Sequence, residues 1–108
     1  MKFVTKKNGT ETILKLQGKK LDASIAPDLK GEILVLCKAK KLIIDLTAVE
    51  FCDSSGLSAL LLAERKMRET GGTVQLVGVQ KKVLSLMKIS HLDQTFHMFD
   101  TLAKAAKG

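Results

Sequence analysis

The stretch from Leu42 to Gly56, LIIDLTAVEFCDSSG, decides the fold that we expect for this chain. It begins with Leu42-Ile43-Ile44-Asp45-Leu46, a short apolar run typical of a strand covered on both faces of a sheet. A link from Thr47 to Cys52 follows, and Asp53-Ser54-Ser55-Gly56 then opens a long amphipathic segment from Leu57 to Thr70. The sequence therefore predicts a buried strand, a surface loop and a helix whose first turn carries two serines.

A serine in the first turn of a helix lies where backbone N–H groups lack partners inside the helix. The positive end of the helix dipole is at the same place, so the fold would tolerate a phosphate on Ser54 or Ser55. The bland interpretation is that both serines only cap the helix, as serines often do. The residues favour a serine switch over a catalytic pocket, and capping stays open beside it.

The ends of these elements carry their own signals. Asp45 interrupts the apolar run, and since a buried acid needs partners, we expect it at the strand end or facing an edge. Gly71-Gly72 stops the helix, with one glycine in the left-handed conformation. Thr73 to Val77 is then the next strand.

Upstream, Phe3 to Thr5 and Thr12 to Gln17 flank Asn8-Gly9, a pair that supplies the positive φ angles of a tight hairpin turn. From Ser24 the apolar residues recur at three- and four-residue steps, which predicts a helix. Ser24 is its expected cap, with Pro27 in the first turn.

Downstream, we expect a short helix from Lys81 to Met87, a brief strand from Thr95 to Phe99 and a terminal helix capped by Asp100. Strands that alternate with helices imply an α/β fold with a mainly parallel sheet and right-handed crossovers. The hairpin adds an antiparallel edge, and the count comes to about four helices. The 108 residues suffice for one domain, which we expect to span 1–108.

Charge divides the chain unevenly. The net charge is +7, and residues 1–41 hold ten lysines against four acids. Residues 42–80 hold three basic residues against five acids, and residues 81–108 hold five against two. No aromatic residues interleave with the lysines, so bases would find no stacking platform, and we expect no nucleic-acid partner.

Other function classes lack their signals. No apolar run reaches the roughly 18 residues that span a bilayer, and the N-terminus lacks the apolar stretch of a signal peptide, so we expect a cytoplasmic protein without membrane insertion. Cys37 and Cys52 fit no metal or redox spacing, and we expect reduced thiols, Cys37 packed and Cys52 open to partial exposure. His91 and His97 have no catalytic or metal-ligand signature. We expect neither an enzyme nor a bound cofactor.

The run from Leu42 through Asp53-Ser54-Ser55-Gly56 resembles the signature of STAS domains, and most of all that of the anti-sigma factor antagonists, the phosphorylatable partners of bacterial anti-sigma kinases. Gly18-Lys19-Lys20-Leu21-Asp22-Ala23 resembles the family's turn before its first helix. Gly71 to Val77 resembles its next helix-to-strand step. The resemblance covers nearly the whole chain, and it implies one STAS domain with this same order of elements.

The resemblance also implies a mechanism. The phosphoacceptor would be Ser55, and Asp22 would lie near it in space. Unphosphorylated, the chain would bind an anti-sigma factor that is also an ATP-dependent serine kinase, freeing a sigma factor; phosphorylation would break the complex and a phosphatase would restore it. The residues that would serve in partner or kinase recognition are Asp22, Asp53, Ser54, Gly56 and Ser58.

Two alternatives stay open. The first is a STAS scaffold or accessory subunit of a transport or sensory complex, which would bind constitutively with Ser55 unmodified. The second is a module that binds a nucleotide or other anion at the helix start near Ser55, which the positive charge would suit, although no P-loop motif is present.

Overall fold

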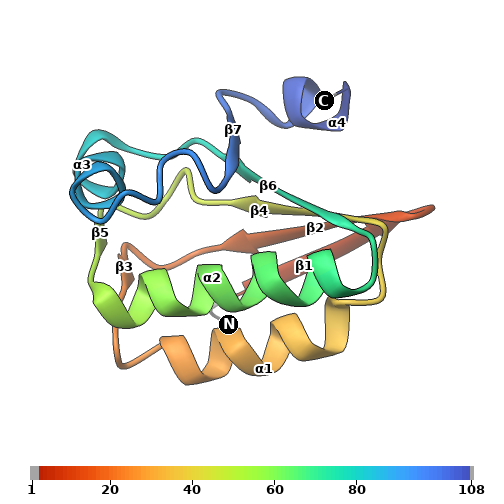
Figure 1. Cartoon of the computed structure of the whole chain (residues 1–108), viewed down its shortest axis with the longest axis horizontal. Helices are drawn as coiled ribbons and strands as arrows, with labels where there is room; N and C mark the ends of the chain where they lie inside the picture. The colour runs from red at the N-terminus through yellow and green to blue at the C-terminus, as the bar shows by residue number, and fades with distance from the viewer. Residues whose placement is uncertain (1–2, 108) are drawn as a thin grey trace.

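The structure, a computed structural model, describes residues 3–107. Its main sheet has the strand order β1-β2-β4-β6-β7, with β1 antiparallel to β2 and every other pair parallel (Figure 1). This confirms the mixed α/β fold with an antiparallel N-terminal hairpin. The strands are β1 (Phe3–Asn8), β2 (Glu11–Leu16), β4 (Lys41–Asp45), β6 (Thr73–Val77) and β7 (His97–Phe99).

The helices cover the two faces of this sheet unequally. The long helices α1 (Ala26–Leu36) and α2 (Ser54–Glu69) lie side by side on one face (Figure 1). The short α4 (Leu102–Lys107) lies on the other face, and α3 (Lys81–Ile89) packs at the end of the sheet near the start of α2. One face is therefore a thick helical layer, and the opposite face carries a single short helix.

The sequence pattern did not predict two strands of two residues each. β3 (Lys20–Leu21) and β5 (Phe51–Cys52) pair in parallel outside the main sheet. The pairing sets Leu21 opposite Cys52, and the amide of Asp53 donates to the carbonyl oxygen of Leu21 at 3.2 Å. This small ladder holds the segment before α1 against the segment before α2, so both helices begin at the same end of the molecule.

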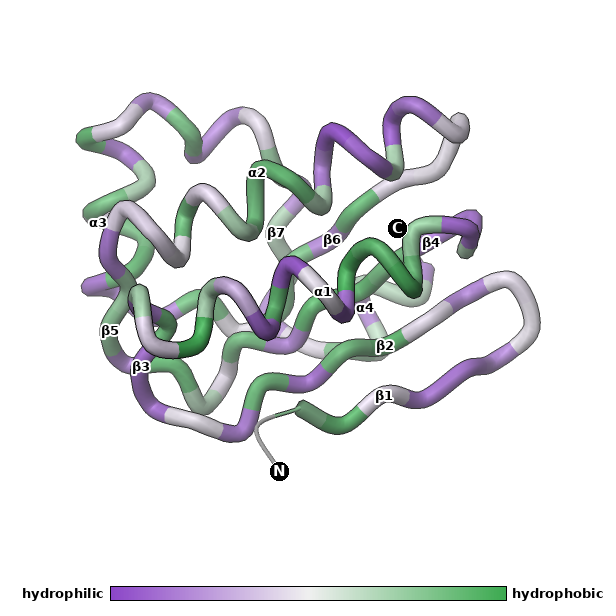
Figure 2. Tube along the Cα trace, turned by 90° about the horizontal axis from the view of Figure 1, so that it is seen from below, coloured by the Kyte–Doolittle hydropathy of each residue, from purple (hydrophilic) through white to green (hydrophobic). Residues whose placement is uncertain are grey.

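The core is aliphatic, as expected for a chain without Trp or Tyr. Alternation along β4 divides it: Leu42 and Ile44 join the large cluster under α1 and α2, whereas Ile43 packs with Val77 and Ala105 under α4. All three β4 residues are fully buried, which confirms a central strand covered on both faces. Figure 2 shows the apolar stretches of the strands running through the middle of the molecule.

Asp45 is the last residue of β4 and is only 6% exposed. Its carboxylate accepts hydrogen bonds from the amide of Thr47 at 2.9 Å and from the hydroxyl of Thr47 at 2.6 Å. The prediction that this acid lies at the strand end is confirmed. These two hydrogen bonds, both from Thr47, offset the loss of hydration that burial brings.

Several predicted turns and caps differ from the structure. The hairpin turn is Gly9-Thr10, with a positive φ of 67° at Gly9 alone, because Asn8 is still part of β1 and pairs with Glu11 of β2. Ser24 does not cap α1: the N-cap is Ile25, without a side-chain hydrogen bond, because the Ser24 hydroxyl donates to Asp22. The prediction for Pro27, in the first turn of α1, is confirmed.

The end of α2 agrees with the predicted cap, whereas the start of α4 differs from it. Gly71 takes a φ of 77° after α2, which confirms a left-handed glycine at the stop. α4 is not capped by Asp100: the Thr101 hydroxyl oxygen accepts from the amide of Lys104 at 3.2 Å, while Asp100 forms an ion pair with the Lys104 side chain. The threonine is one residue closer to the helix and so reaches the free amide.

Candidate functional site

Asp53 fixes the start of α2. Its backbone is extended, and its carboxylate accepts a hydrogen bond from the amide of Gly56 at 3.0 Å, while its carbonyl oxygen accepts from the amide of Leu57 at 3.0 Å. Asp53 is therefore the N-cap, and Ser54 and Ser55 are the first two residues of the helix. The bland interpretation, in which the serines only cap the helix, does not hold, because the aspartate one position earlier takes that role. Capping is one of two roles that the sequence leaves open for Asp53, the other being orientation of the serine hydroxyl for a kinase.

Position 56 requires a glycine, because the space around it has no room for a Cβ atom. A Cβ at this position would meet the carbonyl oxygen of Leu21, the Leu21 side chain at 2.7 Å and the sulfur of Cys52 at 2.8 Å. The residue is buried, and its φ is not in the left-handed region. The glycine thus lets the first turn of α2 lie directly on the β3–β5 ladder, which fixes where the two serines stand.

Three serines of α2 line a groove of about 410 Å³ between the starts of α1 and α2. We call it the serine groove. Ser54 and Ser58 are exposed and Ser55 is half-buried. Within residues 3–107, the hydroxyls of Ser54 and Ser55 make no hydrogen bond, so both are free to react or to contact a partner. The lining residues are Ala23, Ala26, Pro27, Lys30, Ser54, Ser55 and Ser58.

Lys30 is a site residue that the sequence reasoning missed. It is half-buried, lines the serine groove from α1 and has no ion pair within the described part of the chain. The available signal was its position three residues after Pro27, which places both side chains on one side of the first turns of α1. Lys30 is the single cation among the groove's lining residues, so it sets the sign of the local charge.

Asp22 lies beside the site and not in it. The ladder that pairs Leu21 with Cys52 brings Asp22 level with Asp53, but Asp22 does not line the serine groove. Its carboxylate accepts from the Ser24 amide at 3.0 Å and from the Ser24 hydroxyl at 2.6 Å. These bonds, with a smaller contribution from Lys20, hold the pKa of the Asp22 carboxyl below its usual value.

Cys52 lies beneath the first turn of α2. It is 6% exposed, which corrects the expectation of partial exposure, because the β3–β5 ladder and Gly56 cover it. Burial, and then the negative charge of Asp53, raise the pKa of the Cys52 thiol to about 12. Such a thiol is protonated at neutral pH and packs as a small apolar group. Cys37 is half-buried against the core, and both cysteines are free.

Other chemistry has little support here. Among residues 3–107, no three His, Cys, Asp or Glu side chains gather as a metal site would need. Neither His91 nor His97 lines the serine groove. Within the same part of the chain, no helix has the length and apolar character to cross a membrane. The groove offers hydroxyls, one ammonium group and a capped helix start, which suit modification and binding.

A family model described as STAS domain matches residues 2–105, and the chain belongs to this family. A crystal structure of an anti-sigma factor antagonist from Mycobacterium paratuberculosis is similar to it, with 26% identity, 97% of this chain and 90% of that chain covered, and a TM-score of 0.85. An anti-sigma-factor antagonist (STAS) domain protein from Planctomyces limnophilus shares 19% identity over 95% and 93% of the two chains, with a TM-score of 0.87.

Two further structures show the range of the fold. The phosphorylated form of the Bacillus cell fate determinant SpoIIAA shares 19% identity over 97% and 96% of the two chains, with a TM-score of 0.75. A sulfate transporter family protein from Wolinella succinogenes shares 22% identity over 91% and 83%, with a TM-score of 0.80. The same fold thus occurs in regulatory proteins and in a transporter family.

Proposed function

We propose that this protein is an anti-sigma factor antagonist that binds an anti-sigma factor serine kinase and is released from it by phosphorylation of Ser55. The single observation that carries the proposal is the start of α2. There Asp53 takes the capping role and leaves the Ser54 and Ser55 hydroxyls uncommitted at the mouth of the serine groove. The likeness to the antagonist from Mycobacterium paratuberculosis and to phosphorylated SpoIIAA supports it.

The switch acts through charge. A phosphoserine adds about −1.5 to −2 charges at neutral pH, and the first turn of α2 accepts that charge without unfolding. A partner surface shaped around a neutral serine beside Asp53 does not accept it, because repulsion and desolvation together cost a few kcal/mol. Affinity then falls by about a hundredfold or more. The fold itself stays unchanged.

The other recognition residues have distinct parts in this proposal. Ser54 and Ser58 flank Ser55 on the groove and contact the kinase, whereas Gly56 and Asp53 hold the serine in place. Asp22, level with Asp53, contacts the kinase at the groove's edge. A phosphatase acting on phospho-Ser55 restores the complex, and ATP belongs to the kinase. The setting is the bacterial cytoplasm, where sigma factors act.

The first experiment is a pull-down from the native cell lysate with wild-type and Ser55→Glu baits, followed by mass spectrometry. We expect the wild type to recover a serine-kinase-type ATPase and the Ser55→Glu bait to lose it. Ser85→Glu is the matched control, since it adds the same charge to an exposed serine of α3 that does not line the serine groove. It tests whether the loss needs the charge at position 55 or only an added negative charge on the protein.

Phosphorylation itself is tested with the recovered kinase and ATP. Ser55→Ala should abolish incorporation of phosphate, and Ser54→Ala should retain it. Phosphate found on Ser54 or Ser58 in the wild-type protein would overturn the assignment to Ser55. Equal partner recovery by the wild-type and Ser55→Glu baits would overturn the switch.

The likeness to the Wolinella succinogenes transporter family protein favours one second candidate, a constitutive scaffold in a transport or sensory complex. That role predicts recovery of a membrane transport complex by both baits.

A third candidate, an anion or nucleotide module, rests on Lys30 in the serine groove. It predicts that ATP, GTP or inorganic phosphate raises the melting temperature of the wild type and not of Lys30→Met.

A further inference from the structure

A second groove lies at the other end of the helical layer. It occupies about 420 Å³ between the β1–β2 hairpin and the segment that joins α1 to β4. Lys7 and Thr10 line it from the hairpin, Val35 from α1, and Lys38 and Lys40 from the joining segment. We call it the lysine groove. Figure 1 shows the hairpin tip and the start of α2 at opposite ends of the molecule.

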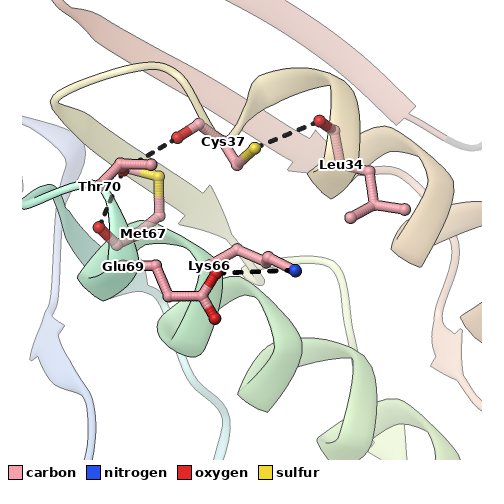
Figure 3. Close-up of polar contacts among 6 residues, drawn as sticks. All are labelled: Leu34, Cys37, Lys66, Met67, Glu69 and Thr70. Atoms are coloured by element: carbon pink, nitrogen blue, oxygen red, sulfur yellow. Dashed lines mark hydrogen bonds and ion pairs between the residues drawn. The ribbon is translucent and has the colours of Figure 1, made fainter.

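Hydrogen bonds support the walls of this groove. The amide of Lys40 donates to the carbonyl oxygen of Thr10 at 3.0 Å, which ties the joining segment to the hairpin. The Thr70 hydroxyl shares its one proton between the carbonyl oxygen of Met67 in its own helix, at 3.0 Å, and that of Cys37 at the end of α1, at 3.3 Å (Figure 3). The groove is therefore held in shape before anything binds, and binding orders little backbone.

The charge in the groove is of one sign. Lys7, Lys38 and Lys40 line it with no carboxylate among the lining residues. None of these three lysines forms an ion pair within residues 3–107, whereas Lys19, Lys66 and Lys104 do. Figure 2 shows the hydrophilic end of β1 and the hydrophilic segment after α1 at this same end of the molecule. The cluster attracts an anionic partner.

An apolar surface adjoins these cations. Val35 is 72% exposed and lines the groove, and its neighbour Leu34 is 53% exposed on the same helix. Val35 therefore places aliphatic carbon directly beside the lysines that line the groove. Together, cations and aliphatic carbon match a protein segment that carries both acidic and aliphatic side chains.

We propose that the lysine groove binds an acidic segment of a partner protein, with an aliphatic side chain against Val35 and carboxylates facing Lys7, Lys38 and Lys40. Nucleic acid fits less well, because no aromatic residue lines the groove for base stacking. A membrane surface fits less well, because the three lysines line a groove and do not lie on a flat face.

This contact is independent of the serine switch. α2 has 16 residues, so its two ends lie about 24 Å apart. The Debye length at physiological salt is about 8 Å, so a phosphate at Ser55 is largely screened at the lysine groove. The lysine groove therefore binds its acidic segment whether or not Ser55 is phosphorylated, so this segment belongs to a partner other than the kinase that the serine groove releases.

The test uses a fluorescein-labelled peptide of alternating pairs of Glu and Leu, with a control peptide in which every Glu is Gln. Fluorescence anisotropy measures its binding to the full chain. We expect the Glu peptide to bind, the Gln peptide not to bind, and Lys38→Glu/Lys40→Glu to weaken binding by about tenfold or more. Val35→Asn should weaken it by several-fold.

The matched control is Lys81→Glu/Lys82→Glu, which changes the charge equally on two exposed lysines of α3 at the far end of the molecule. It should bind the Glu peptide as the wild type does, and so should Ser55→Glu. Lys7→Glu is the second groove variant, should the double variant melt at a lower temperature than the wild type.

Three results overturn the proposal. The first is an absence of Glu-peptide binding up to about 1 mM. The second is an equal loss in the α3 double variant, which would mean attraction by net charge alone. The third is stronger binding to phosphatidylserine vesicles than to the peptide, lost on Lys38→Glu/Lys40→Glu, which would assign the groove to a membrane surface.

Discussion

The two helices that border the serine groove begin in different ways. α2 starts with a side-chain cap from Asp53 and a glycine packed against Leu21, whereas α1 starts at Ile25 with no side-chain cap and a proline in its first turn. The α1 start depends on the main chain, since the carbonyl oxygen of Asp22 accepts from the amides of Ile25 and Ala26. Side-chain chemistry is thus concentrated at the start of α2, the helix that carries the serines.

This difference has a consequence for function. The proposed switch at Ser55 needs the side chain of this serine held in one place before and after phosphorylation. The Asp53 cap and the contact of Gly56 supply that on α2. The start of α1 contributes Lys30 and a groove wall, for which a main-chain turn suffices.

The largest expected effect comes from filling the space at Gly56. Gly56→Ala should lower the free energy of unfolding by about 3 kcal/mol, because its Cβ would overlap Leu21 and Cys52. Gly31→Ala in α1 is the matched control, since nothing lies within 4 Å of a Cβ there. That control should stabilise by about 0.5–1 kcal/mol. Urea denaturation measures both variants. Equal effects would contradict the close contact of Gly56 with Leu21 and Cys52.

The second-largest effect is expected from removing the Asp53 cap of α2. Asp53→Ala should cost about 1 kcal/mol, because the Gly56 amide loses its acceptor. Ser24→Ala, at the start of α1, should cost less than about 0.5 kcal/mol, because the Ser24 hydroxyl caps nothing. Thermal denaturation measures both variants. A larger loss of stability in Ser24→Ala than in Asp53→Ala would contradict the side-chain cap on α2 and its absence on α1.

The thiol below α2 reports how well that helix start is packed. Cys52 has its pKa raised to about 12 in the folded state, so folding favours the neutral thiol. Its contribution to stability is fully present below the unfolded pKa of 9.0 and is lost as pH rises toward 12. We expect iodoacetamide at pH 8 to label the half-buried Cys37 well before Cys52. Peptide mapping would contradict this packing if Cys52 reacted first.

The smallest expected effect is that of Lys30 on a phosphate. In protein carrying phosphoserine at position 55, installed during translation, Lys30→Met should raise the second pKa of the phosphate by about half a unit. The reason is that a nearby ammonium group favours the doubly charged phosphate. Lys15→Met, on the other face of the sheet, is the control. Phosphorus NMR measures both, and a shift equal in the two variants would place Lys30 away from the phosphate.

Most of the fold could be predicted from the spacing of apolar residues and from the residues that end helices and strands. The apolar run at Leu42, the helical spacing after Ser55 and the stop at Gly71 all correspond to observed elements. The β3–β5 ladder could not be predicted, since strands of two residues have no period to detect. It forms because the segments before α1 and α2 meet in space.

The site was predicted in outline and corrected in detail. Ser55 and its neighbours stand at the start of α2, as the pattern indicated. The pattern could not decide which polar residue caps the helix, because Asp53, Ser54 and Ser55 are all good caps and the outcome depends on where the chain leaves β5. Lys30 was missed because its partners across the groove lie on a different helix.

The effect of phosphorylation on partner binding is measured by calorimetric titration of the recovered kinase with unphosphorylated protein and with protein carrying phosphoserine at position 55. We predict that phosphorylation weakens binding by about a hundredfold or more, with unchanged folding by circular dichroism. Affinities that agree within about twofold would contradict the account, because the negative charge at the start of α2 would then not control the partner.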